Sequence, residues 1–237
     1  MSWFDKDPTS TEGADKLPYK IEDFDLKYSI IDPGVPVGWW NSVGSSFNAF
    51  YKESAIDEAA HSVNQDPYEF RLKLLNHQPR FKKVLNTVAE NSKWGRTLSD
   101  FRGLGIAIHR TRGSIGAVVM EIALNESGNL SLEKAWIAID CGRTINPDTV
   151  KAQMQGGFVF GLSACLSEEI TLKNGRVEQS NFCIRVRPTC TKSNLTLIIK
   201  NDSWHLKWRK YFQNWLFWQL GDNRSGRAEI FSRSGRN

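Results

Sequence analysis

The sequence is poor in the features that the commonest classes of site require. Its four cysteines form no C-x-x-C pair, which argues against a zinc ribbon and against a thioredoxin-like redox site. It has no apolar run long enough for a membrane span and no apolar segment near its first residue that would indicate a signal peptide. The glycine patterns of P-loop and dinucleotide-binding proteins are also missing. We therefore do not expect a nucleotide enzyme.

The cysteines also bear on location. They are scattered and suggest no disulfide framework, which fits a reducing compartment but leaves a bacterial periplasm open. We expect a cytoplasmic or a periplasmic protein.

The net charge of +5 belongs to one part of the chain. Residues 183–237 contain 11 of the 31 Lys and Arg but only 3 of the 26 Asp and Glu, which gives this tail a charge of +8. Residues 1–182 carry −3. The basic pI therefore describes no single domain.

Three interpretations of this tail stay open. Its tryptophans recur near helical spacing among basic residues, which is typical of an amphipathic helix on an anionic membrane surface. Aromatic and basic residues together are also used to stack on single-stranded nucleic acid, although we do not expect a nucleic-acid partner. The third interpretation is a shifted reading frame or a truncated gene copy. The residues concerned are Trp204, Trp208, Trp215, Trp218, Lys207, Arg209 and Lys210.

A helix is predicted over residues 46–63. Glu53, Asp57 and Glu58 lie along it, and three carboxylates could be taken for a metal or acid–base site. We interpret them as the solvated flank of the helix.

Two more helices are predicted before residue 100. Asp66 is expected to cap one of them, because its carboxylate can accept amide hydrogens of the first turn and Pro67 lacks the hydrogen that would otherwise need a partner. Another is expected over 80–91. Residues 1–27 are polar and contain two X-Pro breaks, so we expect an extended arm there.

Strands follow these helices. Asn174-Gly175 is a strong signal for a two-residue hairpin turn. The expected strands cover 28–32, 104–110, 115–124, 130–140, 169–172 and 176–180. This order of elements predicts an α+β domain.

The four histidines show no spacing typical of zinc ligands. His109 is the exception of interest, because it ends a strand before a flexible turn and could face a pocket. We predict no metal-ligating residue.

Residues 140–169 contain the most informative motif. Asn146 and Pro147 predict the start of a helix that carries Gly156, Gly157 and Gly161. Glycine lowers helix propensity by roughly 1 kcal/mol relative to alanine, so three of them need a reason. Close packing of another element is one reason, and a flat ligand against the backbone is another. Gln153 lies one turn before Gly157, and its amide can both donate and accept a hydrogen bond.

This motif and two others resemble one enzyme family. The others are G-V-P-V-G-W-W-N-S-V-G-S-S-F-N-A-F at 34–50 and D-P-Y-E-F-R-L-K-L-L at 66–75. The three are similar, in the same order, to the molybdopterin-binding large subunit of the xanthine dehydrogenase and aldehyde oxidase family, especially the isoquinoline 1-oxidoreductase beta type. The resemblance runs from about residue 7 to Phe182.

The resemblance implies a molybdenum hydroxylase. Such enzymes hydroxylate an N-heterocycle or an aldehyde, with water as the oxygen source, at a molybdenum held by molybdopterin. The electrons leave through a small iron–sulfur subunit. In these enzymes the protein mainly orients the groups and supplies hydrogen bonds.

The resemblance also assigns cofactor-binding residues. Gln153 corresponds to a glutamine beside the molybdenum ligands, and Gly156 and Gly157 follow it. A loop that lines the pocket corresponds to Trp40, Asn41, Ser42, Val43 and Gly44. Asn41 stands where the family usually has arginine, so a guanidinium group that could bind an anionic oxygen through two hydrogen bonds is missing.

The resemblance ends after Phe182. A G-x-G-E motif, whose glutamate is the family's catalytic base, does not follow. We therefore assign no catalytic residue, and we expect a fragment that is inactive and binds molybdopterin poorly alone. Residues 28–182 would form the partial cofactor domain between the arm and the divergent tail. The alternative is a non-catalytic protein whose basic tail engages an anionic membrane or partner.

Overall fold

The computed structural model describes residues 8–29, 31, 34–35, 38, 42–166, 170–179 and 195–200, the last range as backbone only. Trp40, Asn41 and nearly all of the basic tail lie outside these residues. The helices are α1 (Pro8–Thr11), α2 (Gly44–Ser62), α3 (Pro67–Leu74), α4 (Pro79–Ser92) and α5 (Pro147–Leu166). The strands are β1 (Arg102–Thr111), β2 (Ser114–Leu124), β3 (Leu130–Asp140), β4 (Leu172–Lys173), β5 (Arg176–Val177) and β6 (Leu195–Lys200).

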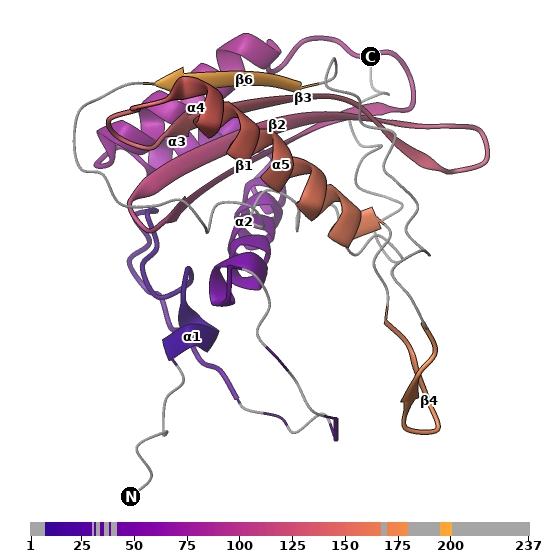
Figure 1. Cartoon of the computed structure of the whole chain (residues 1–237). Helices are drawn as coiled ribbons and strands as arrows, with labels where there is room; N and C mark the ends of the chain where they lie inside the picture. Colours follow the sequence, from indigo (N-terminus) through magenta and orange to yellow (C-terminus); the bar gives the residue numbers. More distant parts are fainter. Residues whose placement is uncertain are drawn as a thin grey trace, which may run out of the picture.

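A four-stranded sheet in the order β1-β2-β3-β6 forms the centre of the molecule (Figure 1). The first three strands are antiparallel neighbours, and β6 lies parallel to β3. Successive residues of each strand point to opposite faces, so β1–β3 supply two separate apolar surfaces. A helix layer covers each of them, which confirms the α+β prediction.

On one face, α4 packs against β2 and β3. Phe81, Val84, Leu85 and Val88 of this helix are at most 1% exposed and meet alternate strand residues such as Ile108. On the other face, Met154, Phe158 and Leu162 of α5 pack against the intervening strand residues. The spacing of three and four residues along each helix places one stripe on the sheet.

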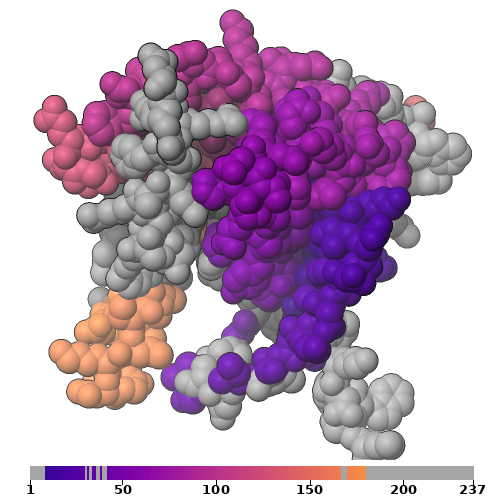
Figure 2. All heavy atoms as spheres, turned by 180° about the vertical axis from the view of Figure 1, so that it is seen from behind, coloured from indigo at the N-terminus to yellow at the C-terminus, as the bar shows by residue number. Residues whose placement is uncertain are grey.

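Local sequence signals located two helix starts and one hairpin turn, although the hairpin strands are shorter than the predicted 169–172 and 176–180: β4 covers Leu172–Lys173 and β5 covers Arg176–Val177. The Asp66 carboxylate accepts the amide hydrogens of Tyr68 and Glu69, at 2.9 and 3.2 Å. The amide of Thr149 donates to the side-chain oxygen of Asn146 at 3.2 Å, so Asn146 caps α5. Asn174 and Gly175 have φ of 52° and 75°, which are the left-handed values that this hairpin turn requires. The β4–β5 hairpin projects from the body of the molecule (Figure 2).

Other predictions need correction. Residues 28, 29 and 31 form no strand. The flank that we interpreted as solvated contains Glu53, which is 1% exposed, because its partners come from other elements. Strand β6 was not predicted. Within the expected arm, residues 8–11 are helical and Tyr19 is buried.

Among the described residues, no helix has both the length and the apolar character that crossing a membrane requires. The same residues contain no cluster of three or more His, Cys, Asp or Glu that could hold a metal ion.

Candidate functional site

Helix α5 presents one face to the sheet and leaves the opposite face open. Phe158 and Leu162 are fully buried on the sheet side, and Gly157 is buried as well. Gln153 and Gly156 are exposed, and their separation of three residues places them on one side of the helix. A Cβ atom added to Gly156 would meet nothing within 4 Å. Gly157 therefore lies on the buried side of the helix, whereas Gly156 borders open space.

The second predicted segment forms a sharp turn at the start of α2, which we call the 42–44 turn. Ser42 has φ of 66° and Val43 has φ of 49°, and both values lie in the left-handed region that non-glycine residues rarely adopt. Val43 is β-branched, so this conformation is strained and needs support from its surroundings. A Cβ atom on Gly44 would overlap the carbonyl oxygen of Thr9, which makes glycine necessary there.

The exposed residues of α5 have the chemical character that one wall of a cofactor site requires. A flat ring system needs a surface without side chains and neutral hydrogen-bonding groups at its edge, and α5 offers the Gly156 backbone beside the Gln153 amide. The described residues of the 42–44 turn are half-buried or buried beneath the N-terminal segment, so they offer less open surface. Ser42, Val43, Gly44, Gln153, Gly156 and Gly157 stay assigned to cofactor binding as predictions.

A buried ionic network holds α2 behind this turn. The Glu53 carboxylate accepts hydrogen bonds from Tyr19 Oη at 2.9 Å, from Arg71 Nε at 3.1 Å and from the amide of Ile108 at 3.1 Å. Arg71 also donates to Asp57 at 2.5 Å and is fully buried. Burial alone would lower the pKa of Arg71, but the carboxylates of Asp57 and Glu53 raise it above its ordinary value.

The same network affects Tyr19. Burial raises the pKa of its hydroxyl well above the ordinary value, and the neighbouring Glu53 carboxylate raises that pKa further. Tyr19 therefore stays a neutral donor. Its hydroxyl joins the N-terminal segment to the middle of α2.

A second buried pair lies between α2 and β1. Lys52 Nζ is 2.6 Å from His109 Nδ1, and both residues are at least 92% buried. Burial, with Lys52 and Arg110 nearby, lowers the pKa of His109 well below 6.5. The imidazole is therefore neutral at physiological pH, and its Nδ1 accepts a hydrogen bond from Lys52. The sequence singled out His109 as a residue that could face a pocket, and the structure places it in the interior.

The turn that leads into α5 depends on Asp140, the last residue of β3. One carboxylate oxygen accepts from Arg80 Nε at 2.7 Å, and the other accepts the amide hydrogen of Gly142 at 3.0 Å. Burial favours the protonated form, but these two hydrogen bonds outweigh it and lower the pKa of Asp140. Asp140 thus fixes the connection between the sheet and the helix that carries Gln153.

Replacing Asp140 by Asn is expected to lower the free energy of unfolding at neutral pH by about 1–3 kcal/mol, because the charged acceptor is lost. A carboxyl group with a lowered folded pKa stabilises the protein above its unfolded pKa of 3.8, and this contribution disappears as the pH falls through the folded value. The difference between wild type and variant should therefore shrink in acid. Denaturant titrations over this range, with the exposed Asp100→Asn as control, measure it. If the difference in free energy of unfolding between wild type and Asp140→Asn does not change with pH, the ionised carboxylate of Asp140 is not what stabilises the turn.

Several residues that shape the site were not predicted. Asn48, Lys52 and Arg71 each contact groups that are distant in sequence: Ser10, His109 and Glu53, respectively. Arg71 lies among the apolar residues Phe70, Leu72 and Leu74 of its helix, and an Arg in such surroundings is a sequence signal for an internal carboxylate.

A comparison with protein families assigns most of the chain. Residues 40–192, well over half of the sequence, match the family model described as molybdopterin cofactor-binding domain. The match extends past Phe182, where the motif-based resemblance ended. It includes α5 and the 42–44 turn.

Curated relatives agree with this assignment. The chain is 40% identical over 152 residues to the beta chain of isoquinoline 1-oxidoreductase of Brevundimonas diminuta, which is 62% of this chain and 20% of that protein. It is 30% identical over 165 residues to a membrane-bound aldehyde dehydrogenase of Gluconacetobacter polyoxogenes, covering 61% and 21%. It is 29% identical over 183 residues to one of the subunits of nicotinate dehydrogenase of Pseudomonas putida, covering 70% and 15%. The chain spans about a fifth or less of the length of these relatives.

A solved structure shows the same fold. Quinoline 2-oxidoreductase from Pseudomonas putida 86 superposes with a TM-score of 0.60 at 11% identity, over 71% of this chain and 46% of that one. The sheet, its two helix layers and the matched sequence region thus lead to one assignment. The chain belongs to the family of molybdopterin cofactor-binding domains found in the large subunits of molybdenum hydroxylases.

Proposed function

We propose that this chain supplies one wall of the molybdopterin site of an enzyme that hydroxylates N-heterocycles or aldehydes with water as the oxygen source. The observation that supports this proposal is the open face of α5, where Gln153 and Gly156 lie exposed within the region that matches the family. The relatives act, by their names, on isoquinoline, aldehydes and nicotinate.

The molybdopterin cofactor, when bound, would supply the two-electron redox chemistry. Gln153 would orient it through an uncharged amide, which adds no charge beside the metal and can serve as donor or acceptor. Gly156 would let the planar ring system approach the helix backbone. The 42–44 turn would present backbone groups from the side of α2.

We do not propose that this chain catalyses the hydroxylation alone. Helix α5 contains no glutamate or histidine, and Asp148 and Lys151 are its only charged residues. No residue here is assigned the role of the base that takes a proton from the attacking water. A general base typically contributes about 10²- to 10⁴-fold in rate, so we propose that the assembled enzyme obtains it from elsewhere.

We propose that this chain needs partner subunits. Two of the matched relatives are named as subunits, and we propose that this chain works with a small iron–sulfur subunit and further large-subunit sequence. The outer face of α5 beyond Lys151 lacks charge although Val159 and Leu166 are 38% and 42% exposed. Ile170, Leu172 and Val177 of the projecting hairpin are more than half exposed. Groups of exposed apolar side chains are typical of protein contact.

Replacing Gln153 by Leu is expected to reduce cofactor retention by about tenfold or more, as loss of a group next to a metal's ligands commonly does. The wild-type chain, purified from cells that make molybdopterin, should carry molybdenum and pterin at less than one equivalent. Molybdenum is measured by mass spectrometry and pterin by fluorescence. Because Gln153 is exposed, its replacement should leave the melting temperature unchanged.

The matched control is Gln155→Leu, which makes the same change two residues away and on another side of the helix. This variant should retain the wild-type content. A wild-type chain without molybdenum or pterin above background would refute the proposed function. Equal losses in the two variants would refute the role of Gln153.

A further inference from the structure

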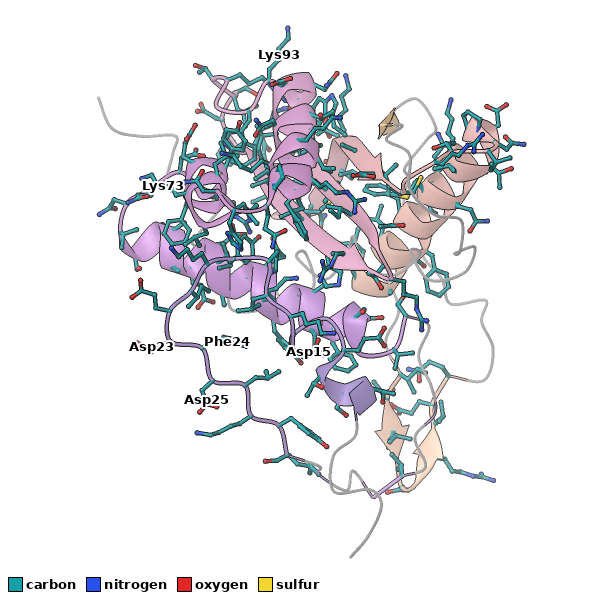
Figure 3. All side chains as sticks on the ribbon, turned by 90° about the vertical axis from the view of Figure 1, so that its left-hand side faces the viewer. Asp15, Asp23, Phe24, Asp25, Lys73 and Lys93 are labelled. Carbon is teal, nitrogen blue, oxygen red and sulfur yellow. The ribbon has the colours of Figure 1, made fainter. Side chains whose placement is uncertain are left out.

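The N-terminal segment runs along α2 and contacts it at both ends. We call residues 8–20 the N-terminal strap. In the space-filling view it lies directly against α2 (Figure 2). It begins beside the first turn of α2, where Gly44 lies against the carbonyl group of Thr9. At its other end, Tyr19 Oη donates to Glu53 of α2 at 2.9 Å, and the amide of Lys20 donates to the carbonyl oxygen of Leu74 in α3 at 2.9 Å. Beyond it, Asp23, Phe24 and Asp25 lead away from the helix (Figure 3).

Asn48 makes the side-chain connection between the strap and the start of α2. Its Nδ2 donates to the carbonyl oxygen of Ser10 at 2.7 Å and to that of Glu12 at 3.0 Å. Both hydrogens of one amide are thus used on two strap residues, and Asn48 is only 8% exposed. The next strap residue, Gly13, lies against Ser45 and His109.

The strap covers the strained part of the site. Ser42 and Val43 hold left-handed conformations that their own side chains disfavour. Such a conformation persists only where the surroundings fix it. The strap residues 9–13 supply contacts on the adjoining turn of α2, at Gly44, Ser45 and Asn48.

We propose that Asn48 is a positioning residue, which holds the 42–44 turn in its left-handed conformation by fastening the N-terminal strap across the first turn of α2. The proposal rests on the proposed function in one respect, namely that the turn belongs to the wall of the cofactor site. Asn48 donates to the strap in this arrangement and acts through it. The turn would then be formed before any cofactor arrives.

The test is Asn48→Asp, which keeps the shape of the side chain and removes both donors. At about pH 8 the new carboxylate faces two carbonyl oxygens, so the strap should detach from α2. Amide hydrogen exchange of residues 42–46 should then become on the order of ten- to hundredfold faster than in wild type at the same pH. Cleavage by trypsin after Lys16, within the strap, should accelerate in parallel.

Acid should reverse the effect. A carboxyl group between carbonyl oxygens has a raised pKa, and when protonated at about pH 5 it can donate one hydrogen bond back to the strap. Exchange in 42–46 should therefore return toward the wild-type rate. Three other titratable groups lie close: Glu12 on the strap, Lys52 on α2 and His109 on β1. Comparison with wild type at each pH removes their contribution.

Two controls separate positioning from general stability. Asn86→Asp is the same substitution at a half-buried amide whose oxygen accepts from Tyr68, and a carboxylate can still accept there, so exchange in 42–46 should not change. Tyr19→Phe removes the contact with Glu53 at the other end of the strap. It should loosen residues 17–20 and leave 42–46 protected.

The outcomes are distinct. Faster exchange of 42–46 in Asn48→Asp that acid restores, with a lower molybdenum content than wild type, supports the positioning role. Unchanged exchange of 42–46 while trypsin cuts the strap faster overturns it, because the turn then holds itself. If wild type carries no molybdenum, the proposed function fails, and the exchange data still decide whether Asn48 fixes the turn.

Discussion

Replacing Arg71 by Met is expected to lower the free energy of unfolding by about 3–5 kcal/mol, the usual result of removing one member of a buried ion pair. The guanidinium contacts Glu53, Asp57 and two backbone carbonyl groups. Without it, the Glu53 carboxylate, which is 1% exposed, loses its closest ion-pair partner and retains only Lys52 Nζ, 3.9 Å away. Denaturant titration of the full chain at neutral pH measures the change.

The control is Arg102→Met, which also removes an arginine bound to two carboxylates. Arg102 contacts Glu121 and Glu133 at 3.0 Å, but its side chain is 36% exposed, so the expected loss is only about 1 kcal/mol or less. Adding Glu53→Gln to Arg71→Met should restore part of the stability, because a neutral amide costs less to bury beside the missing guanidinium than a carboxylate does. Similar losses for the two arginine variants would show that the network does not support the fold.

The network shows why part of the structure could not be predicted. Glu53 was interpreted as solvated because helical spacing places it beside Asp57 and Glu58. Its three hydrogen-bond donors lie 34, 18 and 55 residues away, and no local pattern indicates such contacts. A pattern of carboxylates along a helix defines a face but not what packs against it.

Local chemistry, in contrast, was sufficient for most elements. Asp66 with Pro67, and Asn146 with Pro147, define helix starts through hydrogen bonds that span three residues. Asn174-Gly175 defines the hairpin through its own backbone preferences. Strand β6 pairs with β3 across more than fifty residues, and its identification required the folded sheet.

The candidate site contains some features that the local sequence predicts and others that depend on contacts with distant residues. The motif around Gln153 predicted the helix and its glycines, but only the sheet decides that Gly157 faces inward and Gly156 outward. The 42–44 turn was predicted as a loop of the pocket. Its strain at Val43 and its cover by the N-terminal strap depend on contacts between residues 9–13 and α2.

Lys52 gives the second large effect, on the pH dependence of stability. Burial lowers the pKa of Lys52 from 10.5 to about 8, against the opposing influence of Glu53. Between these two values the unfolded chain binds a proton that the folded chain has lost, so the free energy of unfolding rises with pH. Each pKa unit corresponds to about 1.4 kcal/mol. Below pH 8 the lysine is charged in both states, and the gain is absent.

We expect wild type to gain roughly 2–3 kcal/mol of stability from Lys52 between pH 8 and pH 10, and Lys52→Met to lose this rise. The range stops at pH 10 because tyrosines of the unfolded chain ionise there, whereas burial keeps Tyr19 protonated in the fold. Lys73→Met, at an exposed lysine (Figure 3), should keep the rise. His109 does not contribute, since its pKa lies well below 6.5. If Lys52→Met follows wild type across this range, Lys52 is not buried in its charged form, and the Lys52–His109 pair does not link α2 to β1 as described.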